Sequence, residues 1–217
     1  MKKLFLAVSV MALCFASCKN ETKEPMESDN SIAIDSVATE EPVTTEAPMD
    51  SVAMQKAWEA YMTPGDAHKM MAAEEGKWNN EMTFWMGAGG EPTKATTTAE
   101  IKMIMGGRYQ EATYKGDMMG MPFEGRSTIG FDNSTKEVVS TWIDNMGTGM
   151  LVTRGEYDEA TKTITSAGRM VDPITGKERK VREIYTIVDD NTRKMEMFET
   201  LEGGNEYKSM EIVMKRG

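Results

Sequence analysis

The densest group of potential metal ligands in this 217-residue chain is Met118-Met119-Gly120-Met121. Thioethers are soft ligands that suit Cu(I), but no paired His or Cys accompanies them here. His68 is the single histidine, and a lone His without a His or Cys partner makes a poor metal site. We therefore expect no metal and no cofactor, and we interpret the methionine segment as a flexible apolar connection.

Single residues could take part in acid–base catalysis, but the sequence shows no recognisable catalytic motif that combines them. Asp144 or His68 could act as a base and Arg108 could hold an anion, although a lone His is more often structural. We therefore assign no catalytic residue, and an enzyme acting on a small lipophilic substrate remains one alternative. The polar residues attached to recognisable motifs are Arg108, Glu124, Asp132, Asp144, Arg154 and Glu183. Any of these charges that point inward should be paired, because burying an unpaired charge is costly.

The elements that must position these residues are strands. From position 77 onward apolar and polar residues alternate, and clusters of Gly, Asp, Asn and Pro interrupt the alternation, which is typical of strands joined by turns. The pattern predicts about ten strands, at 77–86, 94–105, 108–114, 123–131, 137–143, 150–157, 163–170, 178–188, 193–200 and 206–216. No helix-length segment intervenes, so the strands should form an antiparallel meander. Closure into a barrel would remove the two edges that an open sheet leaves.

A short helical lead-in precedes the strands. Met54, Trp58 and Tyr61 recur at helical spacing, and Thr63-Pro64-Gly65 should end this first helix. Asp66 should cap a second, shorter helix over 67–75. The lead-in and the barrel together predict a domain over 51–217.

The first 50 residues predict the cellular location of the protein and no folded domain. A basic start and an apolar run over 4–15 are typical of a signal peptide, and Phe15-Ala16-Ser17-Cys18 resembles a lipobox. We expect cleavage after residue 17 and lipidation of Cys18, with an ordinary secretory signal as the rival interpretation. Residues 18–50 are acidic, Pro- and Ser-rich and free of aromatic residues, so we expect a disordered tether. The protein should then be lipid-anchored in the cell envelope, at the periplasmic face or outer membrane.

Charge and composition restrict the classes of molecule that this protein is expected to bind. The formal net charge is -10 and the pI about 4.8, which argues against nucleic acid and against anionic membrane surfaces. Methionine is abundant, 22 residues against 6 Phe, and predicts a soft, adaptable interior. Ile101, Met103 and Met105 share one strand face, as do Met195 and Met197 and, later, Met210, Ile212 and Met214.

Several motifs together resemble a known family. These are Gly76-Lys77-Trp78, Gly106-Gly107-Arg108, Gly120-Met121-Pro122-Phe123-Glu124-Gly125, Gly130-Phe131-Asp132 and Ser140-Thr141-Trp142-Ile143-Asp144. They are similar, in order and spacing, to the bacterial family of domain of unknown function 1579. The resemblance covers about 64–216 and implies a calycin-like barrel, related in shape to lipocalins, with no established activity. Gly76-x-Trp78 also resembles the lipocalin opening signature, which implies that Trp78 closes one end of the barrel and that Arg216 lies across it.

The sequence therefore favours a tethered barrel that binds a small apolar or amphipathic molecule. We expect the binding site to comprise Arg108, Met118, Met119, Met121, Phe123, Trp142 and Arg154, with an arginine available for an anionic head group. The membrane would be contacted through the lipid anchor only, and nucleic acid not at all. A structural envelope lipoprotein with a filled barrel remains the other alternative.

The predicted lipid anchoring at Cys18 can be tested by substitution. We expect Cys18→Ser to move the protein from the membrane fraction to the soluble fraction, measured by fractionation and immunoblotting. Cys14→Ser is the matched control, because cleavage after residue 17 would remove that cysteine. A Cys18→Ser variant that still sediments with membranes would disprove lipidation at this position.

Overall fold

The computed structural model describes residues 50–217. The predicted signal peptide, Cys18 and nearly all of the predicted tether lie outside the described residues. Residues 50–217 belong to one compact unit, so the described part of the chain is self-contained.

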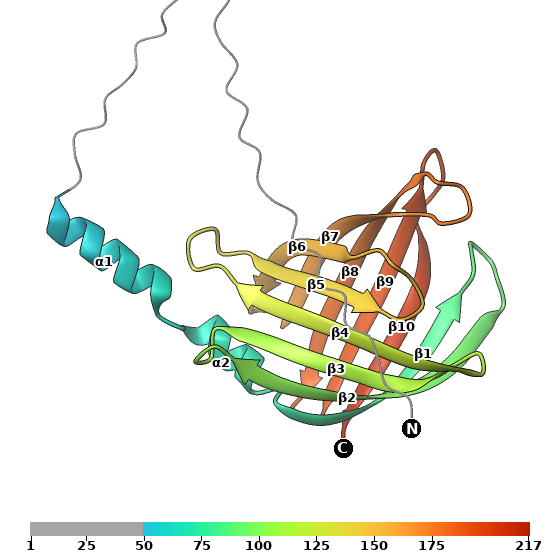
Figure 1. The fold of residues 1–217 in the computed structure, drawn as a ribbon, viewed down its shortest axis with the longest axis horizontal. Helices are drawn as coiled ribbons and strands as arrows, with labels where there is room; N and C mark the ends of the chain where they lie inside the picture. The colour runs from blue at the N-terminus through green and yellow to red at the C-terminus, as the bar shows by residue number, and fades with distance from the viewer. Residues whose placement is uncertain (1–49) are drawn as a thin grey trace, which may run out of the picture. The chain divides into compact units, whose positions relative to one another are not determined.

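Two helices are followed by ten strands, which close into an antiparallel barrel in the order β1-β10-β9-β8-β7-β6-β5-β4-β3-β2 (Figure 1). The prediction of an antiparallel meander of about ten strands with a helical lead-in is confirmed. The helices are α1 (Ser51–Met62) and α2 (Asp66–Ala72). The strands are β1 (Gly76–Trp85), β2 (Pro92–Ile104), β3 (Tyr109–Met118), β4 (Met121–Phe131), β5 (Val138–Asp144), β6 (Leu151–Asp158), β7 (Thr163–Val171), β8 (Glu178–Asp189), β9 (Thr192–Leu201) and β10 (Tyr207–Arg216).

One turn chemistry recurs in three hairpins. Asp132, Asp158 and Asp172 each open a turn and accept a hydrogen bond from the backbone N–H two residues later, at 2.7 to 2.8 Å. The residue four positions after each Asp has a positive φ: Lys136, Lys162 and Gly176. An Asp side chain that bonds its own backbone in this way is a standard turn former, so Asp132 has the turn role that its sequence context suggests.

Two segments differ from the sequence-based expectation. The predicted connection over 115–122 is mostly strand, because Met119 and Gly120 alone form the turn, with φ of 54° and 79°. Two successive residues of positive φ match the twist of the flanking strands and permit a tight hairpin, so the segment is no long flexible lid. Met105 leaves the strand face of Ile101 and Met103, because it begins the β2–β3 turn with a φ of 50°.

Helix α2 lies at one end of the barrel and packs against β2, β3 and β4 (Figure 1). His68 and Met71 are its buried residues. The expectation that Asp66 caps this helix is wrong, because the N-cap is Gly65, whose N–H donates to Nδ1 of His68 at 3.0 Å. The imidazole thus acts as the N3 side chain of a capping box and satisfies the backbone N–H of the N-cap residue.

Trp78 lies where the sheet closes. It pairs with Arg216 in the β1–β10 register, and the Arg216 guanidinium lies 4.5 Å from the indole centroid. The same guanidinium donates to the carbonyls of Ala73 and Glu75 at 2.8 Å each. The indole N–H donates to the carbonyl of Glu74 at 2.8 Å. These bonds attach the end of α2 to both strands of the closing pair.

Helix α1 has no buried residue, and its C-terminal end is held by the β4–β5 turn. The side-chain amide of Asn133 donates to the carbonyls of Ala60, Tyr61 and Thr63 at 2.9 to 3.2 Å. Neither helix of the described chain is long and apolar enough to cross a membrane.

Replacement of Trp78 should measure the strength of this closure. Trp78 is 1% exposed, and we expect Trp78→Ala to lower the free energy of unfolding by about 3–5 kcal/mol in denaturant titrations, because it leaves a cavity and removes a cation–π contact. Trp58→Ala on α1, where nothing is buried, should change it by less than about 0.5 kcal/mol. Equal losses in the two variants would show that Trp78 does not secure the closure.

Candidate functional site

The inside of the barrel is not completely filled by its side chains. Tyr114, Tyr185 and Ile212 face inward and pack against the buried core, yet each keeps part of its surface accessible. Met195 and Met197 lie on the same inward face as the buried Arg193 and are also partly accessible. Side chains that face inward but remain partly accessible indicate free space inside the barrel, and we call this space the lumen.

An aromatic corner occupies this lumen towards the end opposite α2. The Trp142 ring stacks on Phe123 with centroids 6.4 Å apart, and it meets Tyr114 edge-on at 5.0 Å. Its indole N–H donates to Asp144 at 2.8 Å, which fixes the ring orientation. Gly125 makes this arrangement possible, because a Cβ there would lie 2.7 Å from two atoms of the indole ring.

Glu183 of β8 has an inward carboxylate whose hydrogen-bond donors, among residues 50–217, are hydroxyl groups alone. Its Oε2 accepts hydrogen bonds from Thr153 and Ser166, both at 3.2 Å. Burial raises the pKa of Glu183, and the bonds from Ser166 and Thr153 oppose that shift. No Lys or Arg among residues 50–217 forms an ion pair with it.

Tyr114 links the aromatic corner electrostatically to Glu183. Burial raises the pKa of Tyr114 to about 12; Ser127 opposes the shift, and the negative charges of Glu74 and Glu183 add to it. The phenol therefore keeps its proton at neutral pH and can donate a hydrogen bond into the lumen.

The α2 end of the lumen is closed by a compensated network around Glu74. Its Oε1 accepts from Tyr185 and from Nε of Arg193, each at 2.8 Å, and its Oε2 accepts from Gln110 at 3.1 Å. Arg193 also lies 5.2 Å from the Trp78 ring centroid. Both charged side chains of this pair are buried. Together with Tyr185 and Gln110 they close the α2 end of the lumen, and we call these four residues the plug.

A second compensated cluster lies near the opposite end. Arg179 forms ion pairs with Asp172 and with Glu199, the latter at 2.5 Å, and Tyr207 donates to Glu199 at 3.1 Å. The backbone N–H of Thr175 lowers the pKa of Asp172 to about 2, with help from Arg179 and against the effect of burial. The β7–β8 turn is thereby tied to β8 and β9.

The sequence-predicted binding residues fall into two groups. Phe123 and Trp142 lie in the aromatic corner, and Met118 and Met121 pair with each other beside it, at the end of the β3–β4 hairpin. Met119 is at the tip of that hairpin and is 71% exposed.

Two of the expected residues lie elsewhere. Arg108, near α2, donates to the carbonyls of Met105 and Met62. Arg154 is exposed and pairs with Glu137 at 3.5 Å. The two arginines therefore contact neither the aromatic corner nor each other, and we leave them out of the candidate site.

The candidate bases are used in local structure. His68 is buried and accepts the Gly65 N–H, and burial, with a smaller effect from Arg108, lowers its pKa. Asp144 accepts from the Trp142 indole and from the backbone N–H of Met146. No cluster of three or more His, Cys, Asp or Glu within residues 50–217 could hold a metal ion.

Sequence reasoning identified Glu183 as a motif residue but missed its partners. Thr153 and Ser166 are buried polar residues at inward positions of β6 and β7. The available signal was a hydroxyl at a strand position where an apolar residue is expected, on two strands that pair with each other. Tyr114 was missed because an aromatic residue in a strand is also an ordinary core residue.

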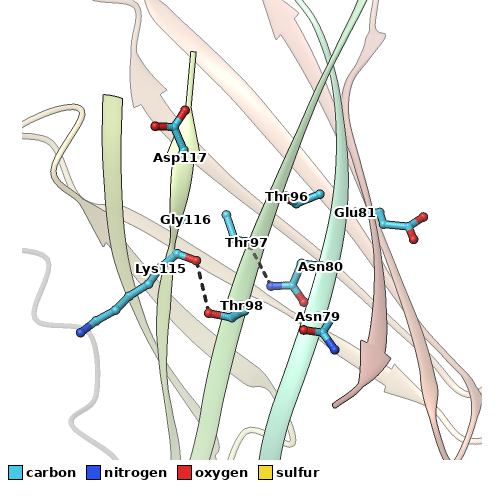
Figure 2. A pocket seen from close by; sticks show the side chains of 9 residues that line it. All are labelled: Asn79, Asn80, Glu81, Thr96, Thr97, Thr98, Lys115, Gly116 and Asp117. Atoms are coloured by element: carbon cyan, nitrogen blue, oxygen red, sulfur yellow. Dashed lines mark hydrogen bonds between the residues drawn. The ribbon is translucent and has the colours of Figure 1, made fainter. Parts of the chain in front are cut away.

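A separate depression of about 580 Å³ lies across β1, β2 and β3 (Figure 2). Its walls are mostly exposed polar residues, and the buried members are Asn80 and Thr97, joined by a hydrogen bond of 3.0 Å. None of the aromatic-corner residues lines it. An open, polar depression of this kind does not suit an apolar ligand.

The burial of Glu183 should appear in the pH dependence of stability. Its folded pKa lies above the usual 4.5, so the stability linked to its proton is complete below that pH and is lost as the pH rises through the folded pKa. In denaturant titrations the stability of Glu183→Gln relative to wild type should therefore rise between about pH 4 and pH 8. Glu91→Gln, at an exposed site, should show no such trend, and parallel curves for Glu183→Gln and wild type would contradict the assignment.

Comparison with known proteins agrees with this geometry but adds no activity. A solved structure, that of Rv2717c from M. tuberculosis, is similar with a TM-score of 0.54 and 13% identity, and the match covers 71% of this chain and 99% of that one. At this identity the likeness shows the fold alone. No curated protein matches the chain at a significant level. The family described as "Protein of unknown function (DUF1579)" matches residues 63–216. The chain therefore belongs to the DUF1579 family.

Proposed function

We propose that this protein is a tethered binding protein of the cell envelope, and that its barrel lumen holds a small amphipathic molecule. The apolar part of the ligand would lie against the aromatic corner formed by Phe123, Trp142 and Tyr114. The polar part would reach Glu183, deeper in the lumen. The lipid anchor on Cys18 and the tether over 18–50 belong to this proposal, with the sequence pattern as their support.

The observation that carries the proposal is that the Glu183 carboxylate lacks an oppositely charged partner among residues 50–217. Ionised groups in protein interiors are normally paired with an opposite charge. Glu74 has Arg193, and Glu199 has Arg179, whereas the partners of Glu183 within residues 50–217 are two hydroxyl groups. A carboxylate has about four acceptor sites, so Glu183 retains capacity for a donor from outside the protein.

This arrangement also defines the polar end of the ligand. A carboxylate accepts hydrogen bonds and favours a cationic or N–H-bearing group, and it disfavours an anionic head group. The aromatic faces beside it suit a ring or a cation through stacking and cation–π contacts. We therefore propose an aromatic amine, or an amphipathic molecule with a donor group, in place of the anionic ligand that the arginines suggested.

The proposal can be tested with N-phenyl-1-naphthylamine, a neutral fluorescent probe that has two aromatic groups and one N–H donor. We expect wild type to bind it with increased fluorescence. Trp142→Ala and Glu183→Gln should each weaken binding by roughly tenfold, because the first removes an aromatic contact and the second replaces a charge-assisted hydrogen bond with a weaker neutral one, each change being worth about 1.4 kcal/mol. Native mass spectrometry of the purified protein should also show a co-purifying small molecule.

The control variants lie on the barrel but outside the lumen. Arg154→Ala and Glu91→Gln change exposed residues and should bind the probe as wild type does. The proposal is wrong if wild type does not bind the probe, or if the outer variants weaken binding as much as the lumen variants do.

A further inference from the structure

The two ends of the barrel have opposite surface chemistry. At the α2 end, the strand connections carry charged residues: Arg108, Asp132, Lys136, Glu137, Glu159, Lys162 and Asp190. At the other end, five hairpin connections gather around the mouth of the barrel (Figure 1). Their exposed tips are rich in Met, Ile and Gly, so the two ends should meet different surroundings.

The exposed apolar side chains at the mouth form what we call the apolar crown: Met86, Met119, Met146, Met150 and Ile174. They come from four different connections, and Met86 is 85% and Ile174 91% exposed. Leu201, at the end of β9 beside the fifth connection, is also exposed. Single exposed apolar residues are ordinary, but a set that encircles one end of a barrel is not.

The charges at this end are largely neutralised. Asp172 is bonded to Arg179, Lys177 pairs with Glu202 at 3.5 Å, and Glu206 pairs with Arg182 at 2.6 Å. Among the connections at the mouth, Glu91 is the charged residue without an ion pair in the described chain. Glu91 is therefore the one uncompensated charge that the mouth connections of the described chain would bring towards an apolar medium.

We propose that the apolar crown docks onto the surface of a neutral, zwitterionic lipid bilayer, with the mouth of the lumen facing the lipid. A ring of separate tips suits a broad flat surface better than it suits a protein partner, whose interface needs a continuous, well-packed core. Unbranched methionines on glycine-containing turns adapt to a disordered acyl boundary. The net charge of -10 favours neutral over anionic lipid.

The length of the chain before the barrel allows this orientation. If Cys18 is anchored, the 32 peptide steps (50 − 18) to Asp50 span up to about 105–115 Å when extended. α1 joins the barrel at the α2 end (Figure 1), so the tether must run back past a barrel whose strands are 7 to 13 residues long. That distance is roughly 25–45 Å, well within its reach.

Helix α1 is the rival membrane contact. Val52, Met54, Trp58, Tyr61 and Met62 are exposed on it. Trp58 and Tyr61 partly cover each other, however, in an edge-on pair at 5.8 Å, and the β4–β5 turn holds the end of α1 away from the mouth of the barrel. We therefore assign the docking surface to the crown and treat α1 as an alternative that the experiment must separate.

The experiment is vesicle flotation with the protein from Lys19 onward, which keeps every described residue and removes the predicted signal peptide and the acylation site. Phosphatidylcholine vesicles should carry wild type upward, and adding anionic phosphatidylglycerol should not improve binding. Met119→Glu should weaken partitioning by roughly tenfold or more, because burial of one Met side chain is worth about that factor. Met119→Glu combined with Ile174→Glu should abolish flotation.

The chain offers a closely matched control at the opposite end. Met105 and Met119 are both turn residues, both 71% exposed, with φ of 50° and 54°. Met105→Glu should therefore leave vesicle binding unchanged, as should Trp58→Glu on α1.

The proposal does not depend on the lumen ligand, because probe binding by Glu183→Gln and vesicle binding by Met119→Glu are separate measurements. It is overturned if wild type does not float with phosphatidylcholine vesicles, or if Met105→Glu weakens flotation as much as Met119→Glu. Loss of binding in Trp58→Glu alone would assign the contact to α1. A concentration-dependent dimer that the crown variant abolishes, without vesicle binding by wild type, would assign the crown to a second copy of the chain.

Discussion

The pairing of β1 with β10 is the constraint on which the rest of the structure depends. A ten-stranded meander left open would expose two rows of unpaired backbone groups. Closure brings Trp78 opposite Arg216 and gives that arginine three tasks at once: it covers the indole and bonds the carbonyls of Ala73 and Glu75. The helix end that those bonds hold carries Glu74, which completes the plug through Arg193 and Tyr185. Closure of the sheet therefore positions the residues that seal the α2 end of the lumen.

The interior charges show how the protein balances burial against pairing. A buried ion is tolerated when an opposite charge and further hydrogen bonds compensate for lost hydration. Glu74 and Arg193, 119 positions apart, meet that condition. Asp172 and Glu199 both pair with Arg179, although the Nε of that arginine has no hydrogen-bond partner in the described chain. Glu183 meets it only in part, through Thr153 and Ser166. Incomplete compensation beside an aromatic corner is what distinguishes the proposed binding site from the networks at either end of the same barrel.

Methionine has two different uses in this chain. Inside, Met195, Met197 and Met214 provide flexible side chains that border the lumen or complete the core. At the mouth, Met86 and Met119 are 85% and 71% exposed on turns with glycine neighbours. The same property, an unbranched and polarizable side chain, serves an adaptable interior and an adaptable surface. A mouth of this kind connects the proposed lumen ligand with the apolar phase from which such a molecule would be taken.

The sequence by itself determined the strands, their antiparallel order and the closure, because alternation at period two and short turn-forming segments are local signals. It also placed Trp78 and Arg216 in the first and last strands, and Phe123 and Trp142 in neighbouring ones.

It did not determine which charged residues face inward: Arg154 and Glu183 both lie in motif-bearing strands, yet one is exposed on the outside and the other lines the lumen. A shift of one residue reverses side-chain direction, and in β8 charged residues occur at both parities, Arg179 and Glu183 on one and Lys180 and Arg182 on the other, so the sequence pattern leaves that direction unmarked. Contacts such as Glu74–Arg193, 119 positions apart, depend on where α2 enters the barrel. Only the closed tertiary structure decides that, because no local pattern records which end of a barrel a preceding helix will fill.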